Sequence, residues 1–223
     1  DMMNGEEYAE MKREAYRASN SYTDDEHLFE ANQLENLKKG IWYDYPDLIF
    51  SNGYKTDHQL NFSGGNEKTR FALSAGYLDE RGTIKNLYFT RYNFRLNLDH
   101  QMNDWLSVGT STTFSRSIQD VGNATGTISN ALLNSPLGDC FDPETGKLNF
   151  FPTTDGLIAN PLFDFDRDHN SNERKINRVF SSVYGEISFL RNFKYKLNLG
   201  VDNYDYRRGE FYGSHSTNRL GGQ

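Results

Sequence analysis

Several features that characterise other protein classes are scarce in this 223-residue chain. Its only cysteine is Cys140, so neither an internal disulfide nor a cysteine-based zinc site can form. No run approaches the ~18 consecutive apolar residues of a membrane-spanning helix. The formal net charge is −7, from 24 Lys and Arg against 31 Asp and Glu, which argues against a nucleic-acid-binding surface.

Motifs of catalysis and cofactor binding are missing as well. The five histidines are scattered and include no His-x-x-x-His pair, which argues against a zinc site. The adjacent glycines at 64–65 and 221–222 lack the spacing of phosphate-binding loops, and no serine lies in a nucleophile-elbow sequence. We therefore expect neither an enzyme nor a bound cofactor.

The chain does contain stretches in which apolar and polar residues alternate. The clearest runs from Tyr88 to Asp99, where Tyr, Thr, Phe and Leu occupy the even positions and mainly Arg, Asn and Asp the odd ones. Side chains of a strand alternate between its two faces, so one face is apolar and the other is charged. Strands of this length, joined by turns that alternate between short and long, are typical of a transmembrane β-barrel.

Six such strands are expected, joined as three hairpins. The connections after the first, third and fifth strands are short, and the others are long. In a membrane barrel the short turns lie on the periplasmic side and the long loops lie outside. The expected fold class is all-β, an antiparallel transmembrane β-barrel segment of about six strands. These strands are expected at about residues 58–64, 69–78, 88–99, 106–115, 178–190 and 193–206.

The expected division of the chain follows from these strands. In residues 1–56, Asn4 with Glu7 makes a capping box and Gly40 can end a helix, so short helices are expected there. The chain begins at Asp1, and we interpret it as an internal piece of a longer protein. The segments are an extracellular loop at 1–56, four strands within 57–117, a long extracellular loop at 118–174 with a helix near 128–133, two strands within 175–207, and the start of a further loop at 208–223.

Two hairpin registers can be predicted from the alternation. Opposing Phe189 to Phe193 pairs apolar with apolar residues along the last hairpin, and it also places an acidic residue opposite a basic one. Opposing Leu98 to Leu106 does the same for the middle hairpin. Both registers keep each face uniform, which is what strand pairing requires when one face is apolar.

Aromatic residues gather toward both ends of the expected strands. A lipid interface selects two such aromatic girdles. A soluble meander or sandwich also shows alternation, usually in shorter strands, and stays open as an alternative. The aromatic residues are Phe62, Phe71, Trp105, Phe189 and Phe193 near the short turns, with Tyr77 and Tyr88 near the long loops.

One ordered set of segments is distinctive. Its parts are Leu60–Gly65, Arg70–Tyr77, Asp79–Gly82 and Arg91–Leu98, in the order strand, tight turn, strand, glycine loop and strand. Together with Met2–Tyr8 upstream, this order resembles the early barrel strands of SusC/RagA-like TonB-dependent outer-membrane transporters. The resemblance covers most of the chain and is weakest at 140–175.

The resemblance implies a segment of a barrel wall. The family's plug domain, TonB-contacting segment and closing strand are not found in this sequence, and plugged outer-membrane transporters have about 22 strands. It further implies location in the outer membrane of a Gram-negative, Bacteroidetes-like bacterium. The implied function is import of an oligosaccharide or a peptide with TonB-derived energy. The implied partners are a SusD-like surface lipoprotein, TonB through segments absent from this sequence, and outer-membrane lipid, with no nucleic acid.

Two other functions stay open at this point. One is a passive barrel porin or adhesin without coupling to TonB, which a plug domain upstream would exclude. The other is a soluble β-rich carbohydrate-binding module, which would fold as a monomer without detergent.

In the barrel interpretation, polar-face residues of the strands line the substrate path. Arg91, Arg95 and Asp99 form either a ladder that contacts the plug or a passing substrate, or charges that satisfy one another in a wet interior. Tyr204 and Tyr206 either stack on cargo or pack within a loop. The candidate path residues are Arg91, Asn93, Arg95, Asn97, Lys196, Asn198, Asp202, Tyr204 and Tyr206.

One acidic stretch resembles a cation-binding loop. Asp164, Asp166 and Asp168 place carboxylates at alternate positions, as in a calcium-binding loop. The sixth position is His169 instead of Gly, and the twelfth is Lys175 instead of Glu. A solvated acidic loop is therefore favoured over a metal site, with these three aspartates as the weak candidate.

Overall fold

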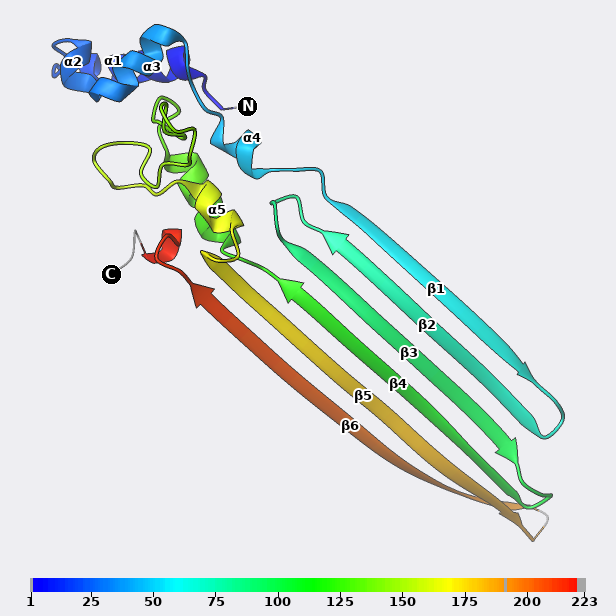
Figure 1. Ribbon diagram of the computed structural model, residues 1–223. Helices are drawn as coiled ribbons and strands as arrows, with labels where there is room; N and C mark the ends of the chain where they lie inside the picture. The colour runs from blue at the N-terminus through cyan, green and yellow to red at the C-terminus, as the bar shows by residue number, and fades with distance from the viewer. Residues whose placement is uncertain (1, 191, 220–223) are drawn as a thin grey trace.

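The computed structural model describes residues 2–190 and 192–219. A long, open antiparallel sheet carries a helical cap at one end (Figure 1). Within the described residues the sheet has six strands in sequence order, so strands that are consecutive in the chain are neighbours in the sheet. The strands are β1 Tyr54–Gly65, β2 Thr69–Arg81, β3 Tyr88–Gln101, β4 Leu106–Asp120, β5 Asn170–Phe189 and β6 Phe193–Tyr212.

The cap is built from the segments before β1, between β4 and β5, and after β6. Figure 1 shows it gathered at the end of the sheet opposite the short turns. None of the helices among the described residues combines the length and apolarity needed to cross a membrane. The helices are α1 Gly5–Ala18, α2 Asp25–Leu28, α3 Ala31–Lys39, α4 Tyr45–Ile49 and α5 Ala124–Leu133, with 3-10 turns η1 Pro161–Phe165 and η2 Thr217–Arg219.

The strands near the cap are longer than the sequence predicts. β5 begins at Asn170 instead of residue 178, and β6 continues to Tyr212 instead of ending at 206. The expected loop at 118–174 is therefore shorter, because β4 also reaches Asp120. Alternation of apolar and polar residues reveals a strand only where one face is apolar. In these extensions neither face is apolar along its length, so the backbone ladder continues without that signal.

One predicted register is confirmed and the other is wrong. In β5 and β6, Phe189 lies opposite Phe193 as expected. In β3 and β4, Leu98 lies opposite Thr110 instead of Leu106, a shift of four residues. The cause is the turn, because the Asn103 side chain accepts hydrogen bonds from the backbone N–H groups of Trp105 (3.1 Å) and Leu106 (2.8 Å). These bonds centre the loop on residues 102–105, beyond the predicted position.

The buried apolar core lies in the cap. One cluster consists of Ala9, Leu28, Phe29 and Leu137, and a second consists of Tyr45, Ile49, Ala131 and Cys140. Among the described strand residues, Leu78 is the only buried hydrophobic side chain. The sheet is therefore not the core of a compact domain, and its apolar residues face outward.

Local signals explain where the cap helices begin and end. The capping box of Asn4 and Glu7 is present in α1, with both hydrogen bonds at 2.9 Å. Gly40 ends α3 with a φ of +67°, a left-handed conformation that glycine adopts without steric cost. α5 begins at Ala124, four residues before the expected helix.

Polar side chains join the N-terminal helices to the loop that follows α5. The Asp139 carboxylate accepts hydrogen bonds from the amides of Asn36 (2.7 Å) and Asn32 (3.0 Å) on α3. The Glu30 carboxylate accepts hydrogen bonds from the backbone N–H groups of Thr154 (2.6 Å) and Asp155 (3.1 Å). These long-range bonds make the cap a single packed unit.

Cys140 supplies a test of this packing. The side chain is fully buried, and burial raises the pKa of its thiol to about 11. Because the thiolate is the reactive form, we expect less than about 1% labelling by iodoacetamide at pH 8 within minutes, and full labelling after denaturation. Mass spectrometry of the labelled protein measures this. Rapid labelling of the folded protein would contradict the packing of the second cap cluster.

Candidate transport surface

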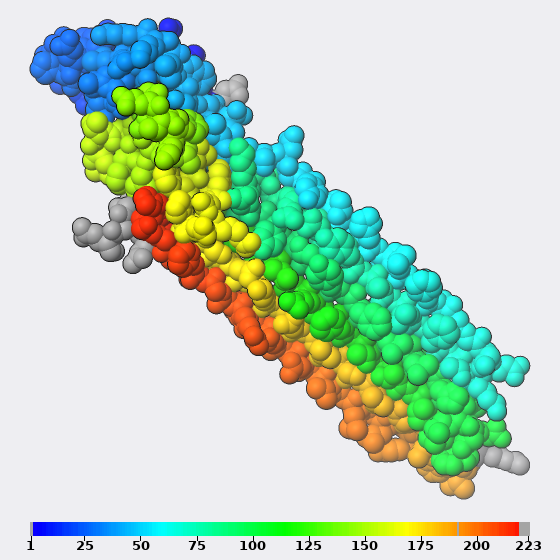
Figure 2. Space-filling model, in the orientation of Figure 1, coloured from blue at the N-terminus to red at the C-terminus, as the bar shows by residue number. Residues whose placement is uncertain are grey.

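The strand registers sort the side chains of the sheet onto two faces. We call the face that includes Leu96 the apolar face, and the face that includes Asn97 the polar face. Along the apolar face, large side chains are open to the surroundings, with Leu60 64%, Leu199 66% and Val201 66% exposed. In the described structure no element covers this face, and Figure 2 shows the sheet extending well beyond the cap. So large an exposed apolar patch indicates contact with a partner or with lipid.

The apolar side chains form a band that crosses the sheet diagonally. Successive cross-strand pairs place Val201 of β6 in the same row across the sheet as Leu96 of β3. On β6 the apolar side chains end at Val201, whereas on β3 they continue four residues closer to the cap, to Tyr92. A band inclined to the strands is what tilted strands in a membrane require. The nine residues from Phe193 to Val201 span about 30 Å along the strand, or about 23 Å at a tilt of ~40°, close to the ~25 Å of a barrel's apolar belt.

Aromatic rings lie at both edges of this band. At the short turns, the rings of Phe189 and Phe193 stack with centroids 5.8 Å apart. Toward the cap, Tyr77 packs against Tyr92 (5.2 Å). Tyr88 does not belong to this edge, although the sequence suggested it. Its hydroxyl lies among polar groups nearer the cap, where it contacts Glu173 and Arg167.

Beyond the band, the same face becomes charged near the cap. On β5 and β6 the next residues are polar or charged, and the Asn177 amide donates to the Asp205 carboxylate at 3.2 Å. Lys175 and Glu173 form an ion pair at 2.6 Å. The strand extensions therefore lie outside the apolar belt, in an aqueous environment.

All nine candidate path residues lie on the polar face. The register of β3 places Arg91, Asn93, Arg95 and Asn97 there, and that of β6 places the other five on the same side. The two groups belong to strands separated by β4 and β5, so they form two stripes instead of one cluster. The candidates are Arg91, Asn93, Arg95, Asn97, Lys196, Asn198, Asp202, Tyr204 and Tyr206.

The first group of contacts on this face spans three strands. The Tyr184 hydroxyl on β5 donates to the Asp99 carboxylate on β3 at 2.6 Å. Its ring crosses β4 at Gly109, where an added Cβ would lie 2.3 Å from the ring. Lys196 on β6 places its ammonium 3.9 Å from the centre of the same ring. Sequence reasoning missed Tyr184 and Gly109, and a glycine inside a strand was the available signal.

A second group of contacts joins β5 to β6. The Arg178 guanidinium binds the Asp202 carboxylate through two hydrogen bonds of 2.9 and 2.6 Å. Tyr204 lies directly opposite Arg178 and is 59% exposed. Tyr206 is 47% exposed, so both rings are open to the space in front of the polar face.

The remaining candidates form few polar contacts with other side chains. Asn97 accepts a hydrogen bond from Ser111 (2.7 Å), and Arg95 donates a long one to Thr113 (3.4 Å). Asn93 covers Gly76, where an added Cβ would lie 2.6 Å from the Asn93 amide. This face offers many exchangeable hydrogen-bond donors and acceptors, which suits a path that holds a solute weakly.

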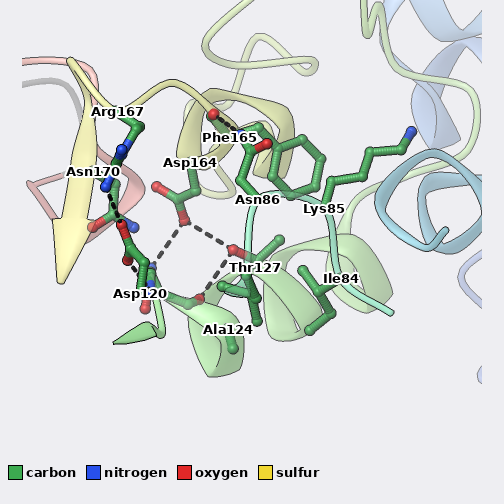
Figure 3. A pocket seen from close by; sticks show the side chains of 13 residues that line it. Ile84, Lys85, Asn86, Asp120, Ala124, Thr127, Asp164, Phe165, Arg167 and Asn170 are labelled. Carbon is green, nitrogen blue, oxygen red and sulfur yellow. Dashed lines mark hydrogen bonds and ion pairs between the residues drawn. The ribbon is translucent and has the colours of Figure 1, made fainter. Parts of the chain in front are cut away.

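The acidic stretch at Asp164 has a different role from cation binding. The buried Asp164 carboxylate accepts hydrogen bonds from Asn123 (3.0 Å), Thr127 (3.2 Å) and Thr217 (2.5 Å), and the contact with Thr127 is drawn in Figure 3. Asp166 and Asp168 are exposed and do not converge on it. Across the described residues, no three acidic, histidine or cysteine side chains are placed to hold a metal ion.

A small cavity lies beside Asp164, with room for about one water-sized sphere (≈ 20 Å³) (Figure 3). Asn170 lines it and is buried with no protein partner for its amide. Arg167 also lines the cavity and pairs with Asp120 at 3.1 Å. A cavity of this size and polarity suits one ordered water, and the arginine opposes a cation.

Asp164 therefore gives a direct prediction. We expect Asp164→Ala to weaken the local structure by about 2–3 kcal/mol, because it removes the acceptor of the buried Thr217 hydroxyl and backbone N–H and of the Asn123 amide. Hydrogen exchange at the start of α5 and at η2 measures the effect. Asp166→Ala, an exposed neighbour, is the matched control and should change little. Equal effects, or protection that depends on calcium, would contradict the structural role.

Comparison with known proteins agrees with this geometry. No family model matches the chain. It is 26% identical over 178 residues to the TonB-dependent receptor P39 of Formosa agariphila, covering 78% of this chain and 16% of that protein. It is 34% identical over 55 residues to the TonB-dependent receptor SusC of Bacteroides thetaiotaomicron, covering 25% of this chain and 6% of SusC. The chain thus spans about one sixth of the first relative's length.

A solved structure has the same fold. The RagAB peptide transporter superimposes with a TM-score of 0.67 at 21% identity, covering 94% of this chain and 26% of the other. The RagAB peptide importer in its "closed-closed" state gives 0.66 at 19% identity. The expected fold class is confirmed as a six-stranded antiparallel segment, although the described sheet is open. The chain is thus similar in sequence to a segment of TonB-dependent receptors, including SusC, and similar in fold to a segment of the RagAB transporter.

Proposed function

We propose that the protein containing this chain imports a nutrient across the outer membrane with energy delivered by TonB. The observation that carries the proposal is the division of the sheet into an exposed apolar face and a polar, charged face. The first suits lipid, and the second suits the wall of a water-filled path. The curated relatives named TonB-dependent receptors support the coupling to TonB.

The proposal assigns each part of the structure a place. The short turns lie on the periplasmic side, and the cap with the long loops lies outside the cell. The outer edges of β1 and β6 have no strand partner among the described residues. Because unpaired backbone groups are costly in lipid, these edges pair with further strands of the same barrel.

The cargo and the partners are part of the proposal. The cargo is an oligosaccharide or a peptide, and the polar-face residues hold it through weak hydrogen bonds. A SusD-like lipoprotein covers the outer opening, in keeping with the similarity to SusC and to the RagAB importer. No step makes or breaks a covalent bond in the cargo.

A transport assay with the complete protein tests this function. We expect uptake of the cargo by whole cells to need the protein and to stop when TonB is deleted or the proton gradient is collapsed. Uptake that persists without TonB would point to a passive porin and contradict the proposal. Recovery of the complete protein as a folded, water-soluble monomer would support a carbohydrate-binding module instead.

A further inference from the structure

The polar face differs in charge from the rest of the chain. Its strand residues include nine Lys or Arg and six Asp or Glu, a net charge of +3, whereas the whole chain has −7. The excess lies on the face that the proposed function assigns to the transport path. A basic wall attracts anionic solutes and raises their local concentration.

Some of these cations are already paired. Lys55, Arg178, Lys194 and Arg208 form ion pairs with Glu80, Asp202, Glu186 and Glu210. Arg70, Arg91 and Arg95 form none within the described part of the chain, and all three are exposed. Asp99 lies opposite Arg70, but its carboxylate is bound by Tyr184. Two other cations of this face, Arg174 on β5 and Lys196 on β6, also form no ion pair within the described residues, and Lys196 lies over the Tyr184 ring. Three of the five cations without an ion pair therefore lie on β2 and β3.

These three arginines are regularly spaced. Arg91 and Arg95 lie four residues apart on β3, about 13 Å along the strand. Arg70 on β2 lies in the row of Asp99, four residues further again. We call Arg70, Arg91 and Arg95 the arginine ladder. It follows the direction in which a solute would cross the membrane.

Most side chains beside the ladder are small. They include Ala72, Ser74 and Gly76 on β2 and Ser111, Thr113, Ser115 and Ser117 on β4, whereas Leu78, directly opposite Arg91, is larger and buried. The three arginine side chains are themselves exposed, so a partner can reach them. Guanidinium groups bind carboxylate and sulfate oxygens through paired hydrogen bonds.

The rest of the polar face suits sugar rings. Serine, threonine and asparagine provide both donors and acceptors, as sugar hydroxyl groups require. Toward the cap, Phe180, Tyr204 and Tyr206 expose 44%, 59% and 47% of their surfaces on the same face. Exposed aromatic rings provide flat apolar surfaces for the C–H faces of a sugar.

We infer that the cargo is an acidic oligosaccharide, whose carboxylate or sulfate groups move along the arginine ladder while its rings contact the exposed aromatic residues. The inference rests on the proposed import function and names its substrate class. Each contact is exposed to water and worth little by itself, so the charge can pass from one arginine to the next.

The experiment uses the complete transporter and two probes of equal length. One is an oligogalacturonate, and the other is its methyl ester, which has the same rings without the charge. We expect the wild type to bind the charged probe about tenfold or more tightly at low salt, with the difference shrinking as salt rises. Isothermal titration calorimetry measures both affinities.

Matched variants assign the preference to the ladder. Arg91→Gln with Arg95→Gln should reduce the preference for the charged probe roughly three- to thirty-fold and leave binding of the ester unchanged. Arg116→Gln is the control, because Arg116 is also exposed and unpaired in the described structure but lies on the apolar face of β4. It should leave both affinities unchanged.

Several results would overturn the inference. Equal binding of both probes by the wild type would do so, as would an acidic peptide that binds through the ladder when the oligogalacturonate does not. Loss of heat stability in the double variant with unchanged probe affinity would assign the ladder to a protein surface inside the barrel. If the preference for the charged probe is absent but TonB-dependent uptake of a neutral cargo persists, the inference about acidic cargo fails and the proposed import function stands. If no cargo is taken up in a TonB-dependent way, the proposed function itself fails.

Discussion

Replacing Leu96 by lysine is expected to destabilise the folded protein in a bilayer by about 2–4 kcal/mol, whereas lysine at the adjacent Asn97 is expected to be tolerated. Leu96 lies near the middle of the diagonal apolar band, in the row of Leu73 and Val201. A charge there meets hydrocarbon, while a charge at Asn97 meets the wet interior. The two positions are adjacent in sequence, so backbone effects are nearly the same.

Urea unfolding of the complete protein in phospholipid vesicles measures this difference. The midpoint should fall for Leu96→Lys and stay within error for Asn97→Lys. In detergent that lets water reach the apolar face, the gap between the two variants should narrow. Equal losses at both positions in vesicles would refute the assignment of the faces.

Gly109→Ala is the second substitution with a large expected effect, a loss of about 1–3 kcal/mol. The new Cβ would lie 2.3 Å from the Tyr184 ring and 2.7 Å from an Asp99 carboxylate oxygen. The ring must move, which breaks the 2.6 Å hydrogen bond to Asp99 and shifts the surface under Lys196. Thermal unfolding of the complete protein in lipid measures the loss.

Gly185→Ala is the matched control for this change. Gly185 lies in β5, and an added Cβ there meets no atom within 4 Å. Removing the ring provides a second check, because Gly109→Ala should cost much less in a Tyr184→Ser background. A full-sized loss in that background would show that Tyr184 is not the cause.

How much of the fold could be predicted depends on what each strand faces. The strands through the apolar band were predictable because one face is apolar along their length. The extensions of β5 and β6 were missed because neither face is apolar along their length, as at Glu173 and Lys175 on β5. Only tertiary hydrogen bonding identifies these residues as strand.

The two registers differ for a related reason. Alternation has a period of two, so a shift by four residues leaves every side chain on its face and cannot be detected from the pattern. The β5–β6 turn is short enough to fix the pairing of Phe189 with Phe193, although its residue 191 lies outside the described part. The β3–β4 turn is longer, and Asn103 decides its position.

The candidate site was predictable as a face but not as a set of contacts. Placing Arg91, Arg95 and Lys196 on the polar face needs only their positions within strands. The contact between Tyr184 and Asp99 spans three strands and needs the correct β3–β4 register. Likewise, Asp164 was considered as a metal ligand because its local spacing resembles a cation loop, while its partners come from distant segments.

The most direct test of the central claim is cysteine scanning through residues 94–98 in the complete protein, in native membranes. Cys140 is buried and should stay silent in the folded protein. Cysteine at 94, 96 and 98 should resist a water-soluble reagent and be quenched by a probe dissolved in lipid, whereas cysteine at 95 and 97 should label readily from water. This alternation is predicted if β3 is part of a barrel wall. Uniform labelling at all five positions would contradict it.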